Sequence, residues 1–331
     1  MANEENARDR DQGSLAARIT TRLRRNPAVG VIGAFLVLFV IFSSLNSSFL
    51  SVKNLTGIFT IVSELGIVTI GIAFVMITGE FDLSVSSVYA LSGFLFVTLA
   101  NQINSLLALF VTLAIAVAIG FINGLITVRV RLPSFITTLG MQMFIRGILL
   151  AVTGGASVSY HGDRIVPAMF TNIVGQGFRP SHLWFIVITV VFSLILTRTR
   201  YGNWVYATGG DREVARAMGV HVDRVKIQNF MISAVLAALS GCIVLTRFKI
   251  ANAAFGVGME LEAIAAAVIG GTFLTGGYGT IIGAFFGALI MGMMRTGLIM
   301  SGAPAYWYQA FVGAILVIAA TINLKLHRIE M

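Results

Sequence analysis

Long apolar runs constrain this chain more than any other feature of its sequence. Ten such runs, separated by short polar segments, take up nearly all of its 331 residues. Most of them approach the roughly 20 residues that an α-helix needs to cross the hydrocarbon core of a bilayer. Only 11% of the residues are charged, against about 25% in a typical soluble domain. The sequence therefore predicts an all-α membrane protein.

The ten runs define one transmembrane domain over residues 28–322, between a basic segment at 1–27 and a tail at 323–331. The predicted spans are residues 28–45, 57–78, 85–100, 105–128, 133–152, 182–197, 227–245, 257–274, 280–300 and 305–322. A cleaved signal peptide has a shorter apolar core, so we expect the first run to be retained as a helix. An even number of spans places both termini on the same side.

The basic residues are distributed unevenly between the two sides of this topology. Of the 23 Lys and Arg residues, sixteen fall on the side of the termini, five on the other side, and Arg146 and Arg295 within spans. Because Lys and Arg near short loops are retained in the cytoplasm, we expect both termini to be cytoplasmic. A miscount of one span would reverse part of this alternation. The net charge of +9 follows from these flanking residues and does not indicate a nucleic-acid-binding surface.

The sequence lacks the motifs of several enzyme classes. It contains no G-x-x-x-x-G-K-[ST] loop, and its glycine-rich segment at residues 276–280 has no lysine to contact phosphates. The four histidines are scattered without an H-E-x-x-H motif, and the one cysteine, Cys242, rules out an intramolecular disulfide. We therefore expect no enzyme activity, no bound cofactor and no metal site in this chain.

Ionisable residues inside or beside the spans are the better functional candidates. A charge in hydrocarbon is costly, so such residues usually face the interior of a bundle or an aqueous path. With neighbouring polar residues, the candidates for a translocation path are Glu64, Asp82, Ser84, Asn123, Glu262 and Arg295. Asp82 has two open interpretations, as a cap of the following helix or as a carboxylate directed into a cavity. Asn123 likewise either lines a path for a hydroxyl-rich solute or forms an interhelical hydrogen bond.

The longest polar segment between spans, residues 198–226, contains a short helix with recognisable ends. Asp211 follows two glycines and is a good N-cap, while Gly219 suits a left-handed C-terminal cap. The charged residues between them keep this helix out of the membrane. It is either a solvated connector or a contact surface for a partner.

Two further patterns concern an internal repeat and the packing of helices. Residues 83–94 resemble residues 261–272, and in the predicted topology the two copies run in opposite directions, as in inverted transporter repeats. The alternative is that small-residue membrane helices simply look alike. Gly279, Gly283 and Gly287 recur every four residues, which favours close helix packing over substrate contact.

Three segments, in order, resemble ribose-type sugar permeases of ATP-binding-cassette importers, within the simple-sugar and branched-chain amino acid permease superfamily. They are residues 78–87 (TGEFDLSVSS), residues 206–220 (YATGGDREVARAMGV) and residues 260–272 (ELEAIAAAVIGGT). The resemblance extends from about Pro27 to the last span. It implies a cobalamin-importer-type (type II) fold of ten helices with two inverted repeats, in the bacterial inner membrane. Where the family usually has GIDLSVG this chain has EFDLSVS, and Glu262 and Arg295 also depart from the usual residues, so the exact sugar or polyol stays open.

The resemblance also implies partners and a mechanism. The implied partners are a periplasmic sugar-binding protein, a cytoplasmic double-cassette ATPase that uses ATP, and a second permease copy or a paralogue. The coupling contacts to the ATPase are then assigned to Asp211, Arg212, Glu213, Ala215, Arg216 and Gly219. Movement of the ATPase would push this helix while the two repeats open the path alternately. The alternative function is an ion-coupled secondary transporter that uses the embedded charges directly.

Overall fold

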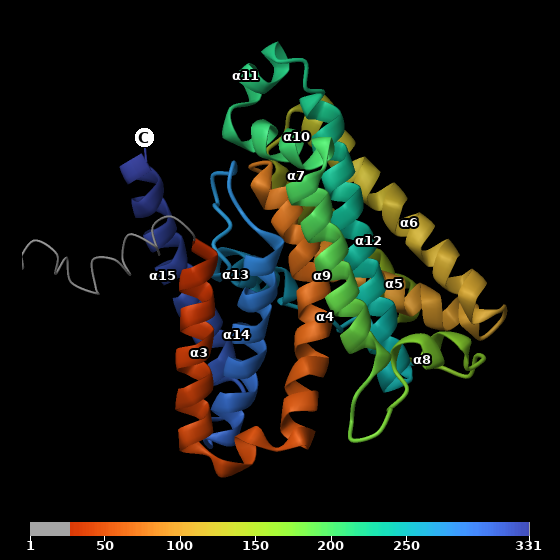
Figure 1. Ribbon diagram of the computed structural model, residues 1–331. Helices are drawn as coiled ribbons and strands as arrows, with labels where there is room; N and C mark the ends of the chain where they lie inside the picture. The colour runs from red at the N-terminus through yellow and green to blue at the C-terminus, as the bar shows by residue number, and fades with distance from the viewer. Residues whose placement is uncertain (1–26, 331) are drawn as a thin grey trace, which may run out of the picture.

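The computed structural model describes residues 27–330, and most of them are helical (Figure 1). The predicted basic segment at residues 1–27 lies outside the described residues except for Pro27, which begins the first helix. The longer helices are α3 (Pro27–Leu45), α4 (Val52–Ile77), α5 (Val85–Ala100), α6 (Ser105–Leu125), α7 (Ser134–Thr153), α9 (Pro180–Arg198), α12 (Val222–Phe248), α13 (Met259–Ile269), α14 (Ile281–Met300) and α15 (Trp307–Glu330). The shorter elements are η1 (Ser47–Leu50), the π-helical η2 (Ile126–Val130), α8 (Ile165–Phe170), α10 (Arg200–Gly210), α11 (Arg212–Ala217), β1 (Val158–Ser159) and β2 (Ile250–Ala251).

Six helices are long and apolar enough to cross a membrane. They are Val52–Ile77, Ser105–Val130, Ser134–Thr153, Pro180–Arg198, Val222–Phe248 and Ile281–Met300. Three shorter apolar helices accompany them, at Gly30–Leu45, Val85–Ala100 and Trp307–Ile318. The prediction of an all-helical, multi-pass membrane protein is confirmed at this level.

The predicted span at residues 257–274 is too long. Its helix, α13, covers only Met259–Ile269, which is 11 residues or about 16 Å at the rise of an α-helix. That is roughly half of the hydrocarbon thickness of a bilayer. Gly258 (φ +83°) precedes the helix and Gly271 (φ +84°) follows it. Glycine adopts this left-handed conformation readily, and a right-handed helix cannot continue through it.

α4 and α12 form the centre of the bundle. Both are buried over most of their length, whereas α6, α7 and α9 bury a much smaller part of their surface. Where α4 and α12 touch, a Cβ added at Gly71 would lie 2.8 Å from the Cα of Ser233. A larger residue at this position would push the two central helices apart, because a backbone atom cannot yield as a side chain can.

The small-residue ridge predicted on α14 packs against α13. A Cβ on Gly283 would lie 2.0 Å from the carbonyl oxygen of Gly270, and one on Gly287 would lie 1.9 Å from that of Ala266. Gly279 precedes the helix and faces the side chain of Ile77 instead. The packing interpretation of this ridge is confirmed.

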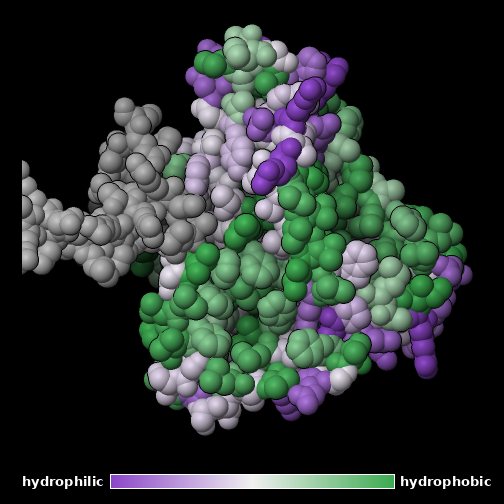
Figure 2. Space-filling model, in the orientation of Figure 1, coloured by the Kyte–Doolittle hydropathy of each residue, from purple (hydrophilic) through white to green (hydrophobic). Residues whose placement is uncertain are grey.

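The molecule has two distinct ends along the axis of the bundle. α10 and α11 lie at one end, and α8 lies towards the opposite one; we call them the α11 end and the α8 end (Figure 1). A broad hydrophobic band lies between hydrophilic patches at the two ends (Figure 2). Exposed side chains that contribute apolar surface on α6, α7 and α9 are Phe110, Phe121, Phe144, Leu183, Val190 and Leu194. Lipid tails suit such a surface, since the backbone polar groups are satisfied within the helices.

A two-stranded antiparallel sheet lies in the loops at the α8 end. Val158 of β1 is opposite Ala251 of β2, and Ser159 is opposite Ile250. The backbone N–H of Tyr160 extends the ladder by donating to the carbonyl of Lys249 at 3.0 Å. The loop after α7 is thereby fixed to the loop after α12.

Candidate functional site

Asp82 lies in the turn between α4 and α5 and is only 1% exposed. Its Oδ1 accepts hydrogen bonds from the backbone N–H and the hydroxyl of Ser84, at 3.0 and 2.6 Å. Its Oδ2 accepts from the hydroxyl of Ser233 on α12 at 2.8 Å. Asn123 of α6 extends the network by donating its amide to Ser84 Oγ at 2.8 Å. Three of the predicted path residues, Asp82, Ser84 and Asn123, therefore meet in one buried network.

The turn that carries Asp82 is also anchored to α7. The backbone N–H of Phe81 donates to Ser134 Oγ at 3.0 Å, and that of Leu83 donates to Thr138 Oγ1 at 3.1 Å. Ser84 occupies the N-cap position of α5 without a side-chain cap bond. The Asp82 carboxylate therefore organises the turn ahead of α5 and cross-links it to α12. It does not cap the helix itself, which was one of its two open interpretations.

Two polar side chains of α7 connect the first turns of α5 and α13. The Gln142 amide donates to Ser86 Oγ and to Glu260 Oε1, both at 2.9 Å. Ser86 and Glu260 are each the second residue of their helix. Arg146 donates to the carbonyl groups of Ala253 and Phe255, and to that of Ser86 at 3.3 Å. α7 thus holds the starts of two short helices from separate parts of the chain together.

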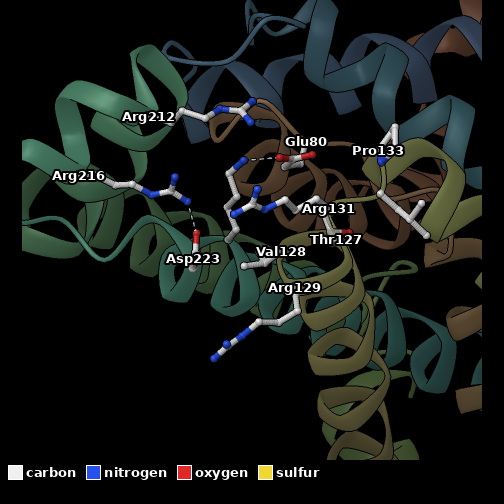
Figure 3. A pocket seen from close by; sticks show the side chains of 11 residues that line it. Glu80, Thr127, Val128, Arg129, Arg131, Pro133, Arg212, Arg216 and Asp223 are labelled. Atoms are coloured by element: carbon white, nitrogen blue, oxygen red, sulfur yellow. Dashed lines mark hydrogen bonds and ion pairs between the residues drawn. The ribbon is translucent and has the colours of Figure 1, made fainter.

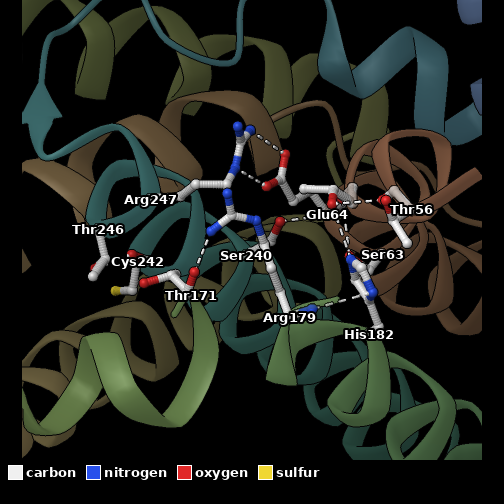
Figure 4. Close-up of polar contacts among 11 residues, drawn as sticks. Thr56, Ser63, Glu64, Thr171, Arg179, His182, Ser240, Cys242, Thr246 and Arg247 are labelled. Carbon is white, nitrogen blue, oxygen red and sulfur yellow. Dashed lines mark hydrogen bonds and ion pairs between the residues drawn. The ribbon is translucent and has the colours of Figure 1, made fainter. Parts of the chain in front are cut away.

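Glu64, half-way along α4, forms a bidentate ion pair with Arg247 near the end of α12 (Figure 4). The Nε–Oε1 and Nη2–Oε2 distances are 2.6 and 2.9 Å. Glu64 is buried, and the guanidinium of Arg247 also lies 4.1 Å from the centre of the Phe248 ring. Arg179 points into the same region and donates to the carbonyl of Thr171. Arg247 therefore neutralises the negative charge of Glu64 inside the bundle.

Glu262 and Arg295 lie close to one aromatic residue on α15. The hydroxyl of Tyr308 donates to Glu262 Oε2 at 3.1 Å, and the Arg295 guanidinium lies 5.4 Å from the centre of the Tyr308 ring. The two charged side chains form no direct ion pair within residues 27–330, and Arg295 is exposed. The structure therefore brings these two predicted path residues together through Tyr308.

The predicted short helix is α11. The Asp211 carboxylate accepts hydrogen bonds from the backbone N–H groups of Glu213 and Val214, at 2.9 and 3.0 Å, and Gly219 has a φ of +83°. Both predicted caps are confirmed. Ala215 packs inward, while Val214 and Met218 are 58% and 80% exposed. One face of this helix is therefore apolar and uncovered.

α10, which the sequence did not predict, attaches this segment to the rest of the bundle. The Tyr206 hydroxyl donates to the carbonyl of Gly279 at 2.7 Å. The phenol of Tyr206 is a donor at neutral pH, as the ordinary pKa of tyrosine, about 10, already ensures, and burial raises its pKa further, to about 12. Next to this contact, Gly277 N–H donates to the carbonyl of Ile77 at 2.8 Å. The α11 region is thus tied to the end of α4 and to the loop before α14.

Comparison with known proteins places this sequence in a family. Residues 54–320 match the family described as "Branched-chain amino acid transport system / permease component". The chain belongs to this permease family.

Within residues 27–330 of the permease, no three His, Cys, Asp or Glu side chains lie close enough together to hold a metal ion.

Curated relatives of the permease align with most of its length. The ribose import permease protein RbsC of Escherichia coli (strain K12) is 35% identical over 87% of this chain and 91% of its own. The xylose/arabinose import permease protein XylH of Sulfolobus acidocaldarius is 34% identical, with 88% and 83% covered. The L-arabinose ABC transporter permease protein AraH of Azospirillum brasilense is 33% identical, with 89% and 86% covered. No solved structure gives a significant match.

Several side chains that shape the polar sites of the permease were not among the predicted site residues. Arg247 was placed in a loop because the predicted span ended at residue 245, although α12 continues to Phe248. Lys226 was likewise assigned to a loop, but it lies in the second turn of α12 and pairs with Glu80. Val214 and Met218 are not among the coupling residues implied by the resemblance, although both are exposed on α11. Their spacing of four residues on a capped helix was a usable signal.

Proposed function

We propose that this chain is the membrane-spanning subunit of an ATP-driven importer, translocating a sugar or sugar-like polyol delivered by a periplasmic binding protein. The observation that carries the proposal is the similarity of nearly the whole chain to permeases named for ribose, xylose and arabinose import. The chain itself supplies no phosphate-binding loop, so ATP would be bound and hydrolysed by a partner ATPase.

The contact with that ATPase would be α11. Asp211 and Gly219 fix the ends of this helix, and Val214 and Met218 present an apolar surface for which the described residues provide no cover. Burying such side chains against a partner is favourable by roughly 1.5–3 kcal/mol each. The hydrogen bond from Tyr206 to Gly279 would carry movement of α11 into the bundle.

The path itself would be opened by two inverted repeats in a ten-span arrangement with cytoplasmic termini. Two features support this proposal. α4 leads into the short helix α5 and α12 leads into the short helix α13, and Gln142 bonds the first turn of each short helix. α3 begins and α15 ends on the side where α10 and α11 lie (Figure 1). Alternating access by rearrangement of such repeats is a general mechanism of transporters.

The test is uptake by the assembled importer. The tagged full-length chain should copurify with a nucleotide-binding subunit. Proteoliposomes containing that complex should take up one of the radiolabelled sugars ribose, xylose or arabinose only with binding protein outside and ATP inside. An ionophore that collapses proton and sodium gradients should leave this uptake unchanged. Uptake that needs no ATPase and stops with the ionophore would instead establish an ion-coupled secondary transporter.

A further inference from the structure

A cavity of about 700 Å³ opens at the α11 end, between α11, the start of α12 and the segment that follows α6. Five cationic side chains line it: Arg129, Arg131, Arg212, Arg216 and Lys226. Its two acidic residues are Glu80 and Asp223. Arg131 and Arg212 line the cavity together with Glu80 (Figure 3).

The positive charge of this cavity is only partly neutralised. Asp223 pairs with Arg216 at 2.5 Å, and the buried Glu80 pairs with the buried Lys226. Arg129, Arg131 and Arg212 have no acidic partner within residues 27–330 and are exposed. Three uncompensated guanidinium groups around one concave site attract anions strongly, because each can donate paired hydrogen bonds to a phosphate.

The backbone that presents two of these arginines is irregular. α6 ends in the π-helical turn η2 (Ile126–Val130), and Arg131 then has a φ of +61°. A left-handed conformation is uncommon for a residue other than glycine and costs free energy unless its surroundings impose it. π-helical turns are often found at functional sites. This conformation places Arg129 and Arg131 at the cavity. The next helix, α7, begins only three residues after Arg131.

We propose that this cavity binds an anionic phosphate ester, with Arg131 and Arg212 as its principal ligands. Basic pockets between transmembrane helices bind the head groups of anionic phospholipids, and a soluble phosphate compound has the same recognition chemistry. A bound phosphate would lie next to the Lys226–Glu80 ion pair. Glu80 is two residues from Asp82, so the ligand would reach the turn that is cross-linked to α12 and α7. A ligand in this site would thus connect α11 electrostatically to the turn that carries Asp82.

Native mass spectrometry of the full-length protein in detergent can count bound phosphatidylglycerol, with zwitterionic phosphatidylcholine as the control lipid. Each cationic side chain near an anionic head group contributes roughly a fivefold gain in affinity, so Arg131→Gln/Arg212→Gln should weaken phosphatidylglycerol binding about 25-fold. The matched control is Arg198→Gln/Arg200→Gln, which removes two exposed arginines at the same end that do not line the cavity. This control should bind like the wild type. Where the double variant does not fold, the single variants should each lose about fivefold.

A second arm distinguishes the source of the phosphate. Inorganic pyrophosphate is titrated into lipid-depleted protein, and binding is measured by calorimetry with the same two double variants. Pyrophosphate binding that only the cavity variant loses, without selective phosphatidylglycerol binding, supports the site with a soluble ligand. Equal losses in the cavity and control variants for both probes, or binding of neither probe by the wild type, would overturn the proposal. None of these measurements depends on sugar transport, so the proposed function can fail separately.

Discussion

At the scale of single residues, the charges in the apolar interior are tolerated because each has a partner on another helix. Glu64 and Arg247 illustrate this best, with two short hydrogen bonds between residues 183 positions apart in the chain. A buried ion pair adds little net stability compared with apolar side chains, but removing one partner leaves a charge that nothing compensates. The pair therefore constrains how α12 can lie against α4.

Arg247→Met should consequently destabilise the protein strongly, by about 3–5 kcal/mol, because Glu64 stays buried without its partner. The double variant Glu64→Gln/Arg247→Met should recover most of that loss. Arg164→Met, which removes an exposed arginine without an ion pair in the described structure, is the control. Thermal unfolding of the purified protein in detergent measures all three. Equal stability of Arg247→Met and the control would show that the pair does not hold the two helices.

For Asp82, two substitutions separate charge from hydrogen bonding. Asp82→Asn keeps the size of the side chain and can still bond Ser84 and Ser233, so we expect a small effect on stability. Asp82→Ala leaves the buried hydroxyl groups unsatisfied and should cost about 3 kcal/mol. We also expect Asp82→Ala to reduce sugar uptake while the assembled complex remains detectable. Wild-type uptake by Asp82→Ala at normal expression would reduce this residue to an incidental feature of the turn.

At the scale of elements, the sequence predicted helices best where local chemistry marks their ends. The predicted bounds of α5, residues 85–100, agree with the structure, and both caps of α11 follow from Asp211 and Gly219. Hydropathy alone made α13 too long, because the apolar run continues through the glycine turns that end the helix. It made α12 too short, because a helix can include charged residues such as Lys226 and Arg247 when they have partners. Those partners depend on long-range packing, which a single sequence does not reveal.

The C-terminal cap of α11 provides the prediction at this scale. Gly219→Val places a β-branched side chain at a φ of +83°, which costs about 1–3 kcal/mol and should distort the end of the helix without affecting any span. Gly210→Ala is a matched control, because its backbone is not left-handed and an added Cβ meets nothing within 4 Å. Sugar uptake and stimulation of the ATPase should fall in Gly219→Val and persist in the control, with equal membrane insertion. Full coupling in Gly219→Val would contradict the role proposed for α11.

At the scale of the whole molecule, the two ends differ in a way that predicts orientation. The α11 end holds a cavity with three uncompensated arginines, and basic residues near short loops are retained in the cytoplasm. The hairpin of β1 and β2 and the helix α8 would then face the periplasm. Cys242, the one cysteine of the chain, is 1% exposed. Cysteines introduced elsewhere can therefore be labelled with little background.

Glu213 and His161 are suitable positions for such probes, since both are exposed and lie at opposite ends. Gly162 is a poorer choice, because a Cβ there would lie 2.4 Å from the carbonyl oxygen of Ala100. In sealed spheroplasts, a membrane-impermeant maleimide should label His161→Cys and leave Glu213→Cys unlabelled. Permeabilising the membrane of cells that lack the partner ATPase should expose Glu213→Cys to the reagent. Labelling of both variants in sealed spheroplasts would place the α8 end and the α11 end on the same side of the membrane. That result would contradict a bundle that crosses the membrane between α8 and α11.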